Sequence, residues 1–325
     1  MSRGVRVWLV GLLLVSGWAT PASAQLVFES MGERALGLAG AFVAVADDAS
    51  AVHWNPAGLI AGQPAGMTIG WHRFQVGNGD AVPTPGQSRG QSSLTSLGTW
   101  PLGISYGTVR RQWIEADEGG LRGHALRVSH VGVTVLQTLL PNVVLGSTLK
   151  IMRGRLATTG VGEPTAEPAF DRMADLEGDG STTFDLDLGL MAMSRVMRAG
   201  VALKNVRSPV FRETAEIATS LPRQARAGLA VLPADGVTLA MDVDLNTVDL
   251  MGDPRRMLAT GGEVALGPRL EVRSGARWNL ARSGQLVGAV GASLAVRTGI
   301  WIDGHYSRGR ERGSREFGVA LRAGF

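Results

Sequence analysis

The chain of 325 residues contains 45 glycines, 18% charged residues and no cysteine. The lack of cysteine excludes disulfides and thiol chemistry, and a net charge of +4 without a basic block argues against a nucleic-acid partner. A glycine-rich, weakly charged chain with a mean hydropathy of +0.11 is unusual for a soluble enzyme. It is ordinary for a membrane barrel, whose strands present one face to lipid.

The first 24 residues have the pattern of an export signal. Arg3 and Arg6 form a positive start, and an apolar run follows from Val7 to Gly17. Ala22-Ser23-Ala24 then supplies the small residues of a cleavage site. We therefore expect residues 1–24 to be a signal peptide and the mature chain to begin at Gln25. No cysteine follows the site, so a lipoprotein is not predicted.

The stretch from Met31 to Ile60 is apolar and rich in small residues. A membrane-spanning helix needs about 20 consecutive apolar residues, and Asp47-Asp48 ends the run before that length is reached. Asp48 or Ser50 is a suitable N-cap for a short helix through Ala51 and Val52. That helix is expected to end near Trp54, because a proline at position 56 biases the residue before it away from helix. This pattern alone fits equally well a helix and turn in the core of an ordinary soluble protein.

Strict alternation of apolar and polar residues dominates the rest of the chain. The clearest predicted strands are Gly236 to Asn246, Phe184 to Met193 and Leu270 to Leu280. In all three, every charged residue falls on one face. A membrane barrel requires this, because an arginine on the lipid face at mid-depth costs about 2–4 kcal/mol. A soluble sandwich permits the same pattern.

The alternation continues to the last residue. From Ser314 to Phe325, aromatic and aliphatic residues occupy every second position, and the chain ends on Phe325. An amphipathic final strand with a terminal phenylalanine resembles the assembly signal of bacterial outer-membrane barrels. This resemblance implies recognition by a barrel-assembly machinery.

Between Gly66 and Phe325 we count about 13–14 candidate strands of ~10 residues. Pro101 divides Ser92 to Val109 into two of them, because proline cannot donate to a strand ladder. Long extracellular loops and short periplasmic turns are expected to alternate. The expected loops are Gly77–Gln91, Arg155–Ser181, Asn205–Ser220 and Leu250–Met257, and the expected turns are Leu140–Asn142, Pro233–Gly236 and Leu266–Pro268. With only two tyrosines, the aromatic girdles are expected to use tryptophan, namely Trp71, Trp100, Trp113, Trp278 and Trp301.

The stretch from Met31 to Ile60 also resembles the N-terminal signature of outer-membrane barrels of the FadL-like fatty-acid transporter type and of their PorV-like relatives. The resemblance implies an all-β fold, a transmembrane antiparallel barrel of fourteen strands over residues 66–325, with residues 25–65 forming a short, helical plug. The plug motif carried over by it consists of Asp47, Asp48, Asn55, Pro56, Ala57 and Gly58.

The FadL-like branch implies an outer-membrane channel in which an apolar small molecule enters from outside, binds near the plug and leaves through a lateral or luminal gap. The PorV-like branch implies instead a structural or docking barrel for a secreted protein. A soluble periplasmic β-protein is the third alternative. For the first two, the expected location is the outer membrane of a Gram-negative type of cell, with outer-membrane lipid as a partner.

Charged residues on the predicted inward faces are candidates for the lining of the lumen. Two interpretations are open for them: pairing across the barrel to hold the plug, or a wetted lining, which we favour for most. The candidates are Asp185, Asp187, Asp242, Asp244, Arg273 and Arg277.

No pattern indicates catalysis or a bound metal. The five histidines lack metal-site spacing and no nucleophile motif appears, so we expect no enzyme, no cofactor and no metal. Within the acidic stretch 171–181, the residues from Asp175 to Ser181 resemble the start of a calcium loop. The twelfth position, which needs a glutamate, holds Leu186, so a solvated acidic loop is the favoured interpretation and calcium binding stays open.

Overall fold

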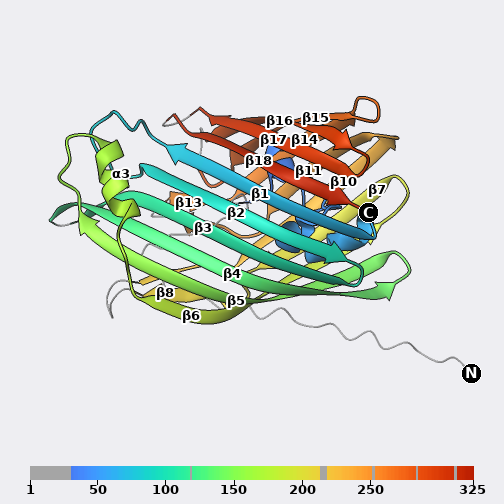
Figure 1. The fold of residues 1–325 in the computed structure, drawn as a ribbon, viewed down its shortest axis with the longest axis horizontal. Coiled ribbons are helices and arrows are strands. Elements are labelled where there is room, and N and C mark those ends of the chain that lie inside the picture. Colours follow the sequence, from blue (N-terminus) through green and yellow to red (C-terminus); the bar gives the residue numbers. More distant parts are fainter. Residues whose placement is uncertain (1–30, 118, 213–217, 251–252, 283–284, 311–312) are drawn as a thin grey trace, which may run out of the picture.

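The computed structural model describes residues 31–117, 119–212, 218–250, 253–282, 285–310 and 313–325. They form a closed antiparallel barrel of fourteen strands, with a short helical segment near the N-terminus inside it (Figure 1). The predicted all-β barrel of fourteen strands is confirmed. The proposed signal peptide and its cleavage site lie outside the described residues. Among the described residues, no helix is long and apolar enough to cross a membrane.

Neighbouring strands of the barrel are mostly neighbours in sequence, and β1 closes the ring by pairing with β18. The barrel strands are β1 (Ala65–Val76), β2 (Ser88–Thr99), β3 (Leu102–Asp117), β4 (Gly120–Leu140), β5 (Val143–Gly160), β6 (Gly180–Met193), β7 (Met197–Lys204), β10 (Gln224–Ala234), β11 (Val237–Asp244), β14 (Met257–Ala265), β15 (Leu270–Asn279), β16 (Leu286–Arg297), β17 (Ile300–Gly309) and β18 (Arg315–Gly324). β1 begins one residue before the predicted barrel boundary.

The remaining elements are not strands of the barrel wall. They are α1 (Glu33–Gly37), α2 (Ala51–Trp54), the 3-10 helix η2 (Pro56–Ala61), α3 (Ala166–Ala174), and two small hairpins made of β8 (Val210–Arg212) with β9 (Ala218–Ser220) and β12 (Val248–Leu250) with β13 (Asp253–Arg255). The predicted short helix through Ala51 and Val52 ends at Trp54, as expected.

The outer face of the barrel is apolar, as membrane embedding requires. On β4, Val131, Val133 and Val135 are 48–51% exposed, whereas Thr134 between them is fully buried and faces inward. The same alternation runs around the ring, and large aliphatic and aromatic side chains stand exposed on every barrel strand from β1 to β6. A continuous apolar belt of this kind is stable in contact with lipid and unfavourable in water.

The two ends of the barrel differ in the length of their connections. At one end the turns are tight, as between β4 and β5, where only Pro141 and Asn142 intervene. At the other end the connections are long and carry α3 and both small hairpins. Short turns are typical of the periplasmic side and long loops of the extracellular side. We call these the short-turn end and the loop end.

The predicted loop from Arg155 to Ser181 is too long at both ends. β5 continues to Gly160 and β6 begins at Gly180, and α3 occupies the middle of the connection. β4 has 21 residues and β5 has 18, so both strands are much longer than the ~10 residues needed to cross the membrane.

The predicted split of residues 92–109 at Trp100-Pro101 is confirmed, because β2 ends at Thr99 and β3 begins at Leu102.

The predicted tryptophan girdle is correct only in part. Trp71, Trp100 and Trp278 are 37–55% exposed on the outer surface, and Trp301 is half-buried. Trp113 is only 3% exposed because it falls on the inward face of β3, where its ring stacks on that of His124 with centroids 4.8 Å apart. The girdle prediction is therefore wrong for Trp113, and also for Trp301, which shares the inward face of β17 with Asp303 and lies beneath the Arg322 guanidinium.

Deleting Phe325 is expected to lower the yield of assembled barrel several-fold. Phe325 is 74% exposed at the end of β18, and its backbone N–H donates to the carbonyl oxygen of Ala65 across the closing seam at 2.8 Å. The measurement is the amount of heat-modifiable protein in the outer-membrane fraction. Phe317→Ala is the matched control, because Phe317 is an exposed phenylalanine within the same strand. Undiminished yield of the deletion variant would refute the assembly-signal role.

Candidate functional site: the segment inside the barrel

Residues 31–62, the luminal segment, lie inside the barrel (Figure 1). α1 contacts β1 and β15–β18, whereas η2 contacts β4, β5 and β6 on the other side. The segment therefore crosses the lumen from one wall to the other. From Phe42 to Ala46 every side chain is at most 1% exposed, so this part of the lumen is filled.

Asn55 of the Asn-Pro-Ala motif joins three parts of the molecule. Its backbone is extended, with φ −154°, and its side-chain oxygen accepts a hydrogen bond from the N–H of Ala57, which caps η2. Its amide nitrogen donates to the carbonyl oxygens of Val43, at 2.9 Å, and of Leu190 in β6, at 3.2 Å. Pro56 occupies the first turn of η2, where a missing N–H costs nothing. The motif thus fastens the luminal segment to itself and to the wall.

Glycines on the inner wall allow the backbone of the luminal segment to approach closely. Gly261 of β14 and Gly275 of β15 are directly paired. A Cβ added at Gly261 would lie 2.8 Å from the carbonyl oxygen of Leu38, and one added at Gly275 would lie 2.6 Å from it. Gly200 of β7 stands in the same relation to Val43, where a Cβ would come within 2.7 Å of the carbonyl oxygen. Part of the high glycine content therefore serves the fit between wall and segment.

Arg34 is the main electrostatic link between the luminal segment and the wall. Its guanidinium contacts Glu263 of β14 at 2.6 Å and Asp48 at 3.2 Å, and it also pairs with Asp47. Asp47 in turn meets Arg198 of β7 at 3.0 Å. These charges are largely withdrawn from solvent, so each depends on its partners for stability.

The ionisation of the luminal segment follows from this environment. Burial alone lowers the pKa of the Arg34 guanidinium, but the carboxylates of Asp47 and Glu263 raise the pKa well above its ordinary value. Glu33 is 2% exposed, and burial, with smaller contributions from the negative charges of Asp303 and Asp48, raises the pKa of its carboxyl to about 8. Burial therefore favours the protonated form of the Glu33 carboxyl, while its neighbours keep Arg34 charged.

Asp242 of β11 holds the backbone of the luminal segment. One of its carboxylate oxygens accepts hydrogen bonds from the N–H groups of Phe42, at 2.9 Å, and Val43, at 2.8 Å. On the same strand, Asp244 pairs with Arg226 at 2.7 Å. Asp242 is 1% exposed and Asp244 8%. Asp242 acts on the segment directly, whereas Asp244 fixes a wall arginine.

The other four predicted lining residues make ion pairs along the wall. Lys150 of β5 lies 3.1 Å from Asp185 and 2.7 Å from Asp187. Arg273 contacts Glu263 at 2.9 Å and Arg277 contacts Glu316 at 2.6 Å. Arg273 thereby reaches the cluster around Arg34 through Glu263.

All six predicted lining residues lie inside the barrel, each at most 8% exposed. The wetted lining favoured from the sequence is wrong for them, because each is buried and bonded to a wall or luminal partner. Sequence reasoning missed Arg34, Lys150, Arg226 and Glu263. Arg34 carried a signal, since it is the only basic residue between Met31 and Ala46.

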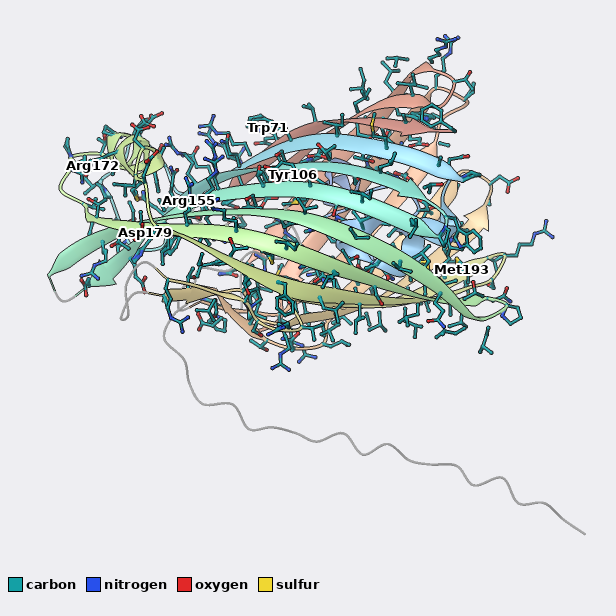
Figure 2. The ribbon with its side chains drawn as sticks, turned by 60° about the horizontal axis from the view of Figure 1, so that its bottom comes forward. Trp71, Tyr106, Arg155, Arg172, Asp179 and Met193 are labelled. Atoms are coloured by element: carbon teal, nitrogen blue, oxygen red, sulfur yellow. The ribbon has the colours of Figure 1, made fainter. Side chains whose placement is uncertain are left out.

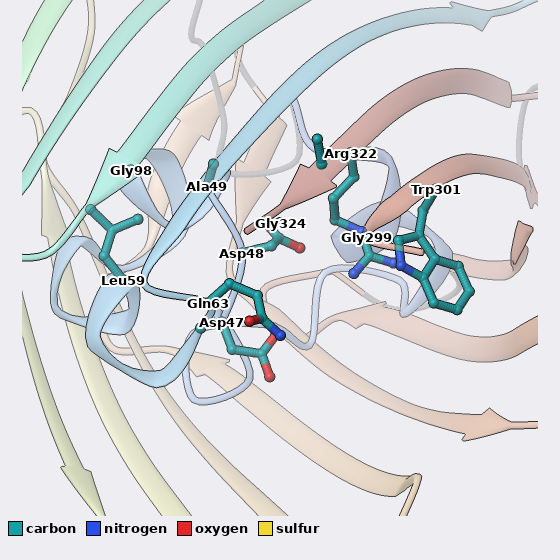
Figure 3. Close-up of a pocket in the computed structure, with 13 residues that line it drawn as sticks. Asp47, Asp48, Ala49, Leu59, Gln63, Gly98, Gly299, Trp301, Arg322 and Gly324 are labelled. Carbon is teal, nitrogen blue, oxygen red and sulfur yellow. The ribbon is translucent and has the colours of Figure 1, made fainter. Parts of the chain in front are cut away.

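Two small cavities adjoin the luminal segment. One of about 110 Å³ lies at the short-turn end, where Asp47, Asp48 and Gln63 face Trp301 and Arg322 (Figure 3). The other, of about 40 Å³, lies on the side of β3–β6 between residues such as His53 and Met152. Among the described residues, no group of three or more histidines and carboxylates is arranged to hold a metal ion.

Beyond the luminal segment, toward the loop end, the inner wall formed by β3, β4 and β5 is apolar, whereas the opposite wall carries the Arg277–Glu316 ion pair. The side chain of Phe211, from the β8–β9 hairpin, is fully buried against the inner face of β5 beside Gly154. The apolar cluster consists of Trp113, Leu126, Val128, Met152, Leu156, Phe211 and Leu221. The inner surface of an aqueous pore is polar, so an apolar inner wall needs a different explanation.

Comparison with known proteins gives a partial family match. The profile of the family described as "F plasmid transfer operon, TraF, protein" matches residues 112–244, which is less than half of the chain. No curated protein matches the sequence.

Solved structures match over almost the whole chain. The monoaromatic hydrocarbon channel CymD has a TM-score of 0.63 at 12% identity, covering 92% of this chain and 99% of its own. A Pseudomonas aeruginosa FadL homologue has a TM-score of 0.63 at 11% identity, covering 94% and 100%. The Pseudomonas putida toluene transporter TodX has a TM-score of 0.55 at 12% identity, covering 84% and 91%. At these identities the likeness establishes the fold: this chain folds as the FadL homologue, CymD and TodX do.

Proposed function

We propose that this protein is an outer-membrane channel for hydrophobic compounds, with the luminal segment acting as its plug. The proposal includes export by residues 1–24 and no catalytic activity. The fold shared with CymD, TodX and a FadL homologue supports it, since the first two are a monoaromatic hydrocarbon channel and a toluene transporter.

The apolar inner wall is the observation that carries the proposal. A channel for ions or sugars gains nothing from Val128, Met152 and Leu156 facing inward in the lumen. A hydrocarbon or an acyl chain gains about 25 cal/mol for each Å² of apolar surface that leaves water against such a wall. The cluster lies next to the luminal segment, because the small cavity between them is lined by Met31 and Val52 as well as by Met152.

The structure corresponds to a closed state of the proposed channel. Phe211 and Leu221 fill the space in front of the apolar wall, and the luminal segment fills the lumen beyond it. Passage of a ligand therefore requires displacement of the β8–β9 hairpin and of at least part of the luminal segment. The apolar wall would bind the ligand that replaces Phe211.

Val128→Asn is expected to weaken binding or uptake of an apolar ligand about tenfold, because an amide buried without a partner costs about 1–3 kcal/mol. The probes are radiolabelled toluene and oleate, measured as cell uptake and as binding to the purified protein. Val131→Asn is the matched control: Val131 lies on the same strand but is 50% exposed on the outer face, whereas Val128 is 1% exposed. Equal uptake by Val128→Asn and the parent protein would contradict the proposed ligand path.

A second candidate is a docking barrel for a secreted protein. It is supported by the tight filling of the lumen and by the match of residues 112–244 to a family named after a plasmid transfer operon. A scaffold would bind neither probe and would retain a protein cargo in a pull-down that depends on the loop end. A stoichiometric apolar ligand co-purifying with the protein would favour the channel.

A further inference from the structure

A row of arginines crosses five neighbouring strands on the outside of the barrel. Cross-strand pairing places Arg73 of β1 opposite Gln91 of β2, and Gln91 opposite Arg110 of β3. Arg110 pairs in turn with Arg127 of β4, and Arg127 with Arg155 of β5. We call Arg73, Arg110, Arg127 and Arg155 the arginine row.

The row points away from the lumen and lies beyond the apolar belt. On β3, Ile104 and Tyr106 are 55% and 50% exposed, and Arg110 shares their face by alternation. On β5, Ile151 is 61% exposed and Arg155 follows it on the same face, toward the loop end. Figure 2 shows this order along the barrel: Met193 lies at the short-turn end, Trp71 and Tyr106 farther along, and Arg155 beyond them toward Arg172. The row thus begins where the hydrocarbon-facing residues end.

Helix α3 lies over the same outer surface. Its apolar residues Ala169, Phe170 and Met173 pack on Ile114 of β3, and Met173 also lies beside Gly123 of β4. A groove of about 510 Å³ separates the helix and the residues after it from the wall. The groove is lined by all four members of the row, together with Arg89 and Arg111, and by three acids, Asp171, Asp175 and Glu177.

Positive charge is in excess in the groove, where six arginines face three acids. Asp171 pairs with Arg89 at 2.8 Å, and no ion pair between described residues involves the row itself. Arg110 lies directly opposite Arg127, and Arg127 directly opposite Arg155. Like charges at directly opposed positions destabilise a sheet. The opposed arginines therefore repel one another, and an anion that bridges them would relieve this repulsion.

We propose that the arginine row binds the phosphate groups of lipids in the membrane leaflet at the loop end of the barrel. Guanidinium groups bind phosphate through paired, charge-assisted hydrogen bonds. A phosphate on a lipid is delivered to this height by its own acyl chains, which lie against the apolar belt just described. A phosphorylated glycolipid or glycerophospholipid meets both requirements. The inference needs the transmembrane barrel but not the transport function.

The test is lipid binding to the purified full-length protein in detergent, followed by native mass spectrometry. The probes are diphosphorylated lipid A, phosphatidylglycerol and, as the neutral reference, phosphatidylcholine. The triple variant Arg110→Gln, Arg127→Gln, Arg155→Gln is expected to lose at least tenfold in affinity for the anionic lipids. Its matched control removes three exposed arginines at the short-turn end, as Arg195→Gln, Arg269→Gln, Arg297→Gln, and is expected to bind as the parent does.

Equal lipid affinity of the parent and the row variant would overturn the proposal. An equal loss of lipid affinity in the control variant would also overturn it, because it would show that net charge and not position decides binding. Inorganic phosphate distinguishes a lipid from a free anion. If it displaces lipid A at millimolar concentration or below, the site is a free-phosphate site and the lipid assignment fails. Heat-modifiable migration on gels verifies folding. If the triple variant does not fold, Arg127→Gln alone is expected to lower the affinity by about threefold, and an unchanged affinity would again refute the row as a lipid site.

Discussion

Removing residues 32–59 is expected to leave a barrel that assembles and conducts. The deletion preserves every ladder between the barrel strands, which satisfy their backbone hydrogen bonds among themselves. It empties the part of the lumen filled by the segment from Phe42 to Ala46 and exposes inward-facing charges such as Asp242 and Glu263 to water. The parent should conduct rarely in planar bilayers, and the deletion variant should show large, long-lived openings.

A second variant tests whether the lumen is closed by the specific contacts of residues 32–59 or merely by the volume that a chain of this length occupies. In it, residues 32–59 are replaced by a flexible glycine–serine linker of equal length. If specific contacts hold the plug, this variant should also conduct, with noisier openings than the deletion. Failure of both variants to form heat-modifiable barrels would mean that the segment belongs to the folding core and not to a plug.

Replacing Arg34 by alanine is expected to loosen the luminal segment without opening the sheet. The change leaves Glu263, Asp47 and Asp48 without their shared partner, and breaking a buried pair in this way costs about 3–5 kcal/mol. These charges join the segment to the wall and not strand to strand, so the loss should appear as release of the segment. The measurements are channel opening in bilayers and protease cleavage within residues 31–62 of the detergent-solubilised protein.

Two controls isolate the effect of that ion pair. Arg195→Ala removes an exposed arginine from the β6–β7 turn and should change neither measurement. The double variant Arg34→Ala with Glu263→Gln should restore part of the closure, because it removes a carboxylate that has lost Arg34, while Asp303 still pairs with Arg273. Unchanged opening and protection in Arg34→Ala would show that packing against the wall, rather than the charge cluster, keeps the lumen closed.

Alternation along the chain was sufficient to predict the barrel strands but not how far they extend at the loop end. The strand over residues 237–244 follows the predicted phase closely, with Leu239 and Met241 outward and Asp242 inward. The predicted loop began at Arg155, whereas β5 continues to Gly160 and contains both Arg153 and Arg155. Those arginines are compatible with a strand because they stand outside, beyond the apolar belt. Depth in the membrane, which decides whether an outward charge is tolerated, is not a property of a local pattern.

Sequence by itself determined that each strand has an apolar and a polar face, that a proline divides β2 from β3, and that Asp47-Asp48 prevents a spanning helix. These are local consequences of side-chain period and backbone chemistry. Only the tertiary structure decided which inward charges meet. Arg34 and Glu263 are 229 residues apart, and closure of the ring between β1 and β18 sets the register that brings them together. Alternation says which face a residue occupies, but the stagger of a closed barrel decides its neighbours across the lumen and its height against the membrane.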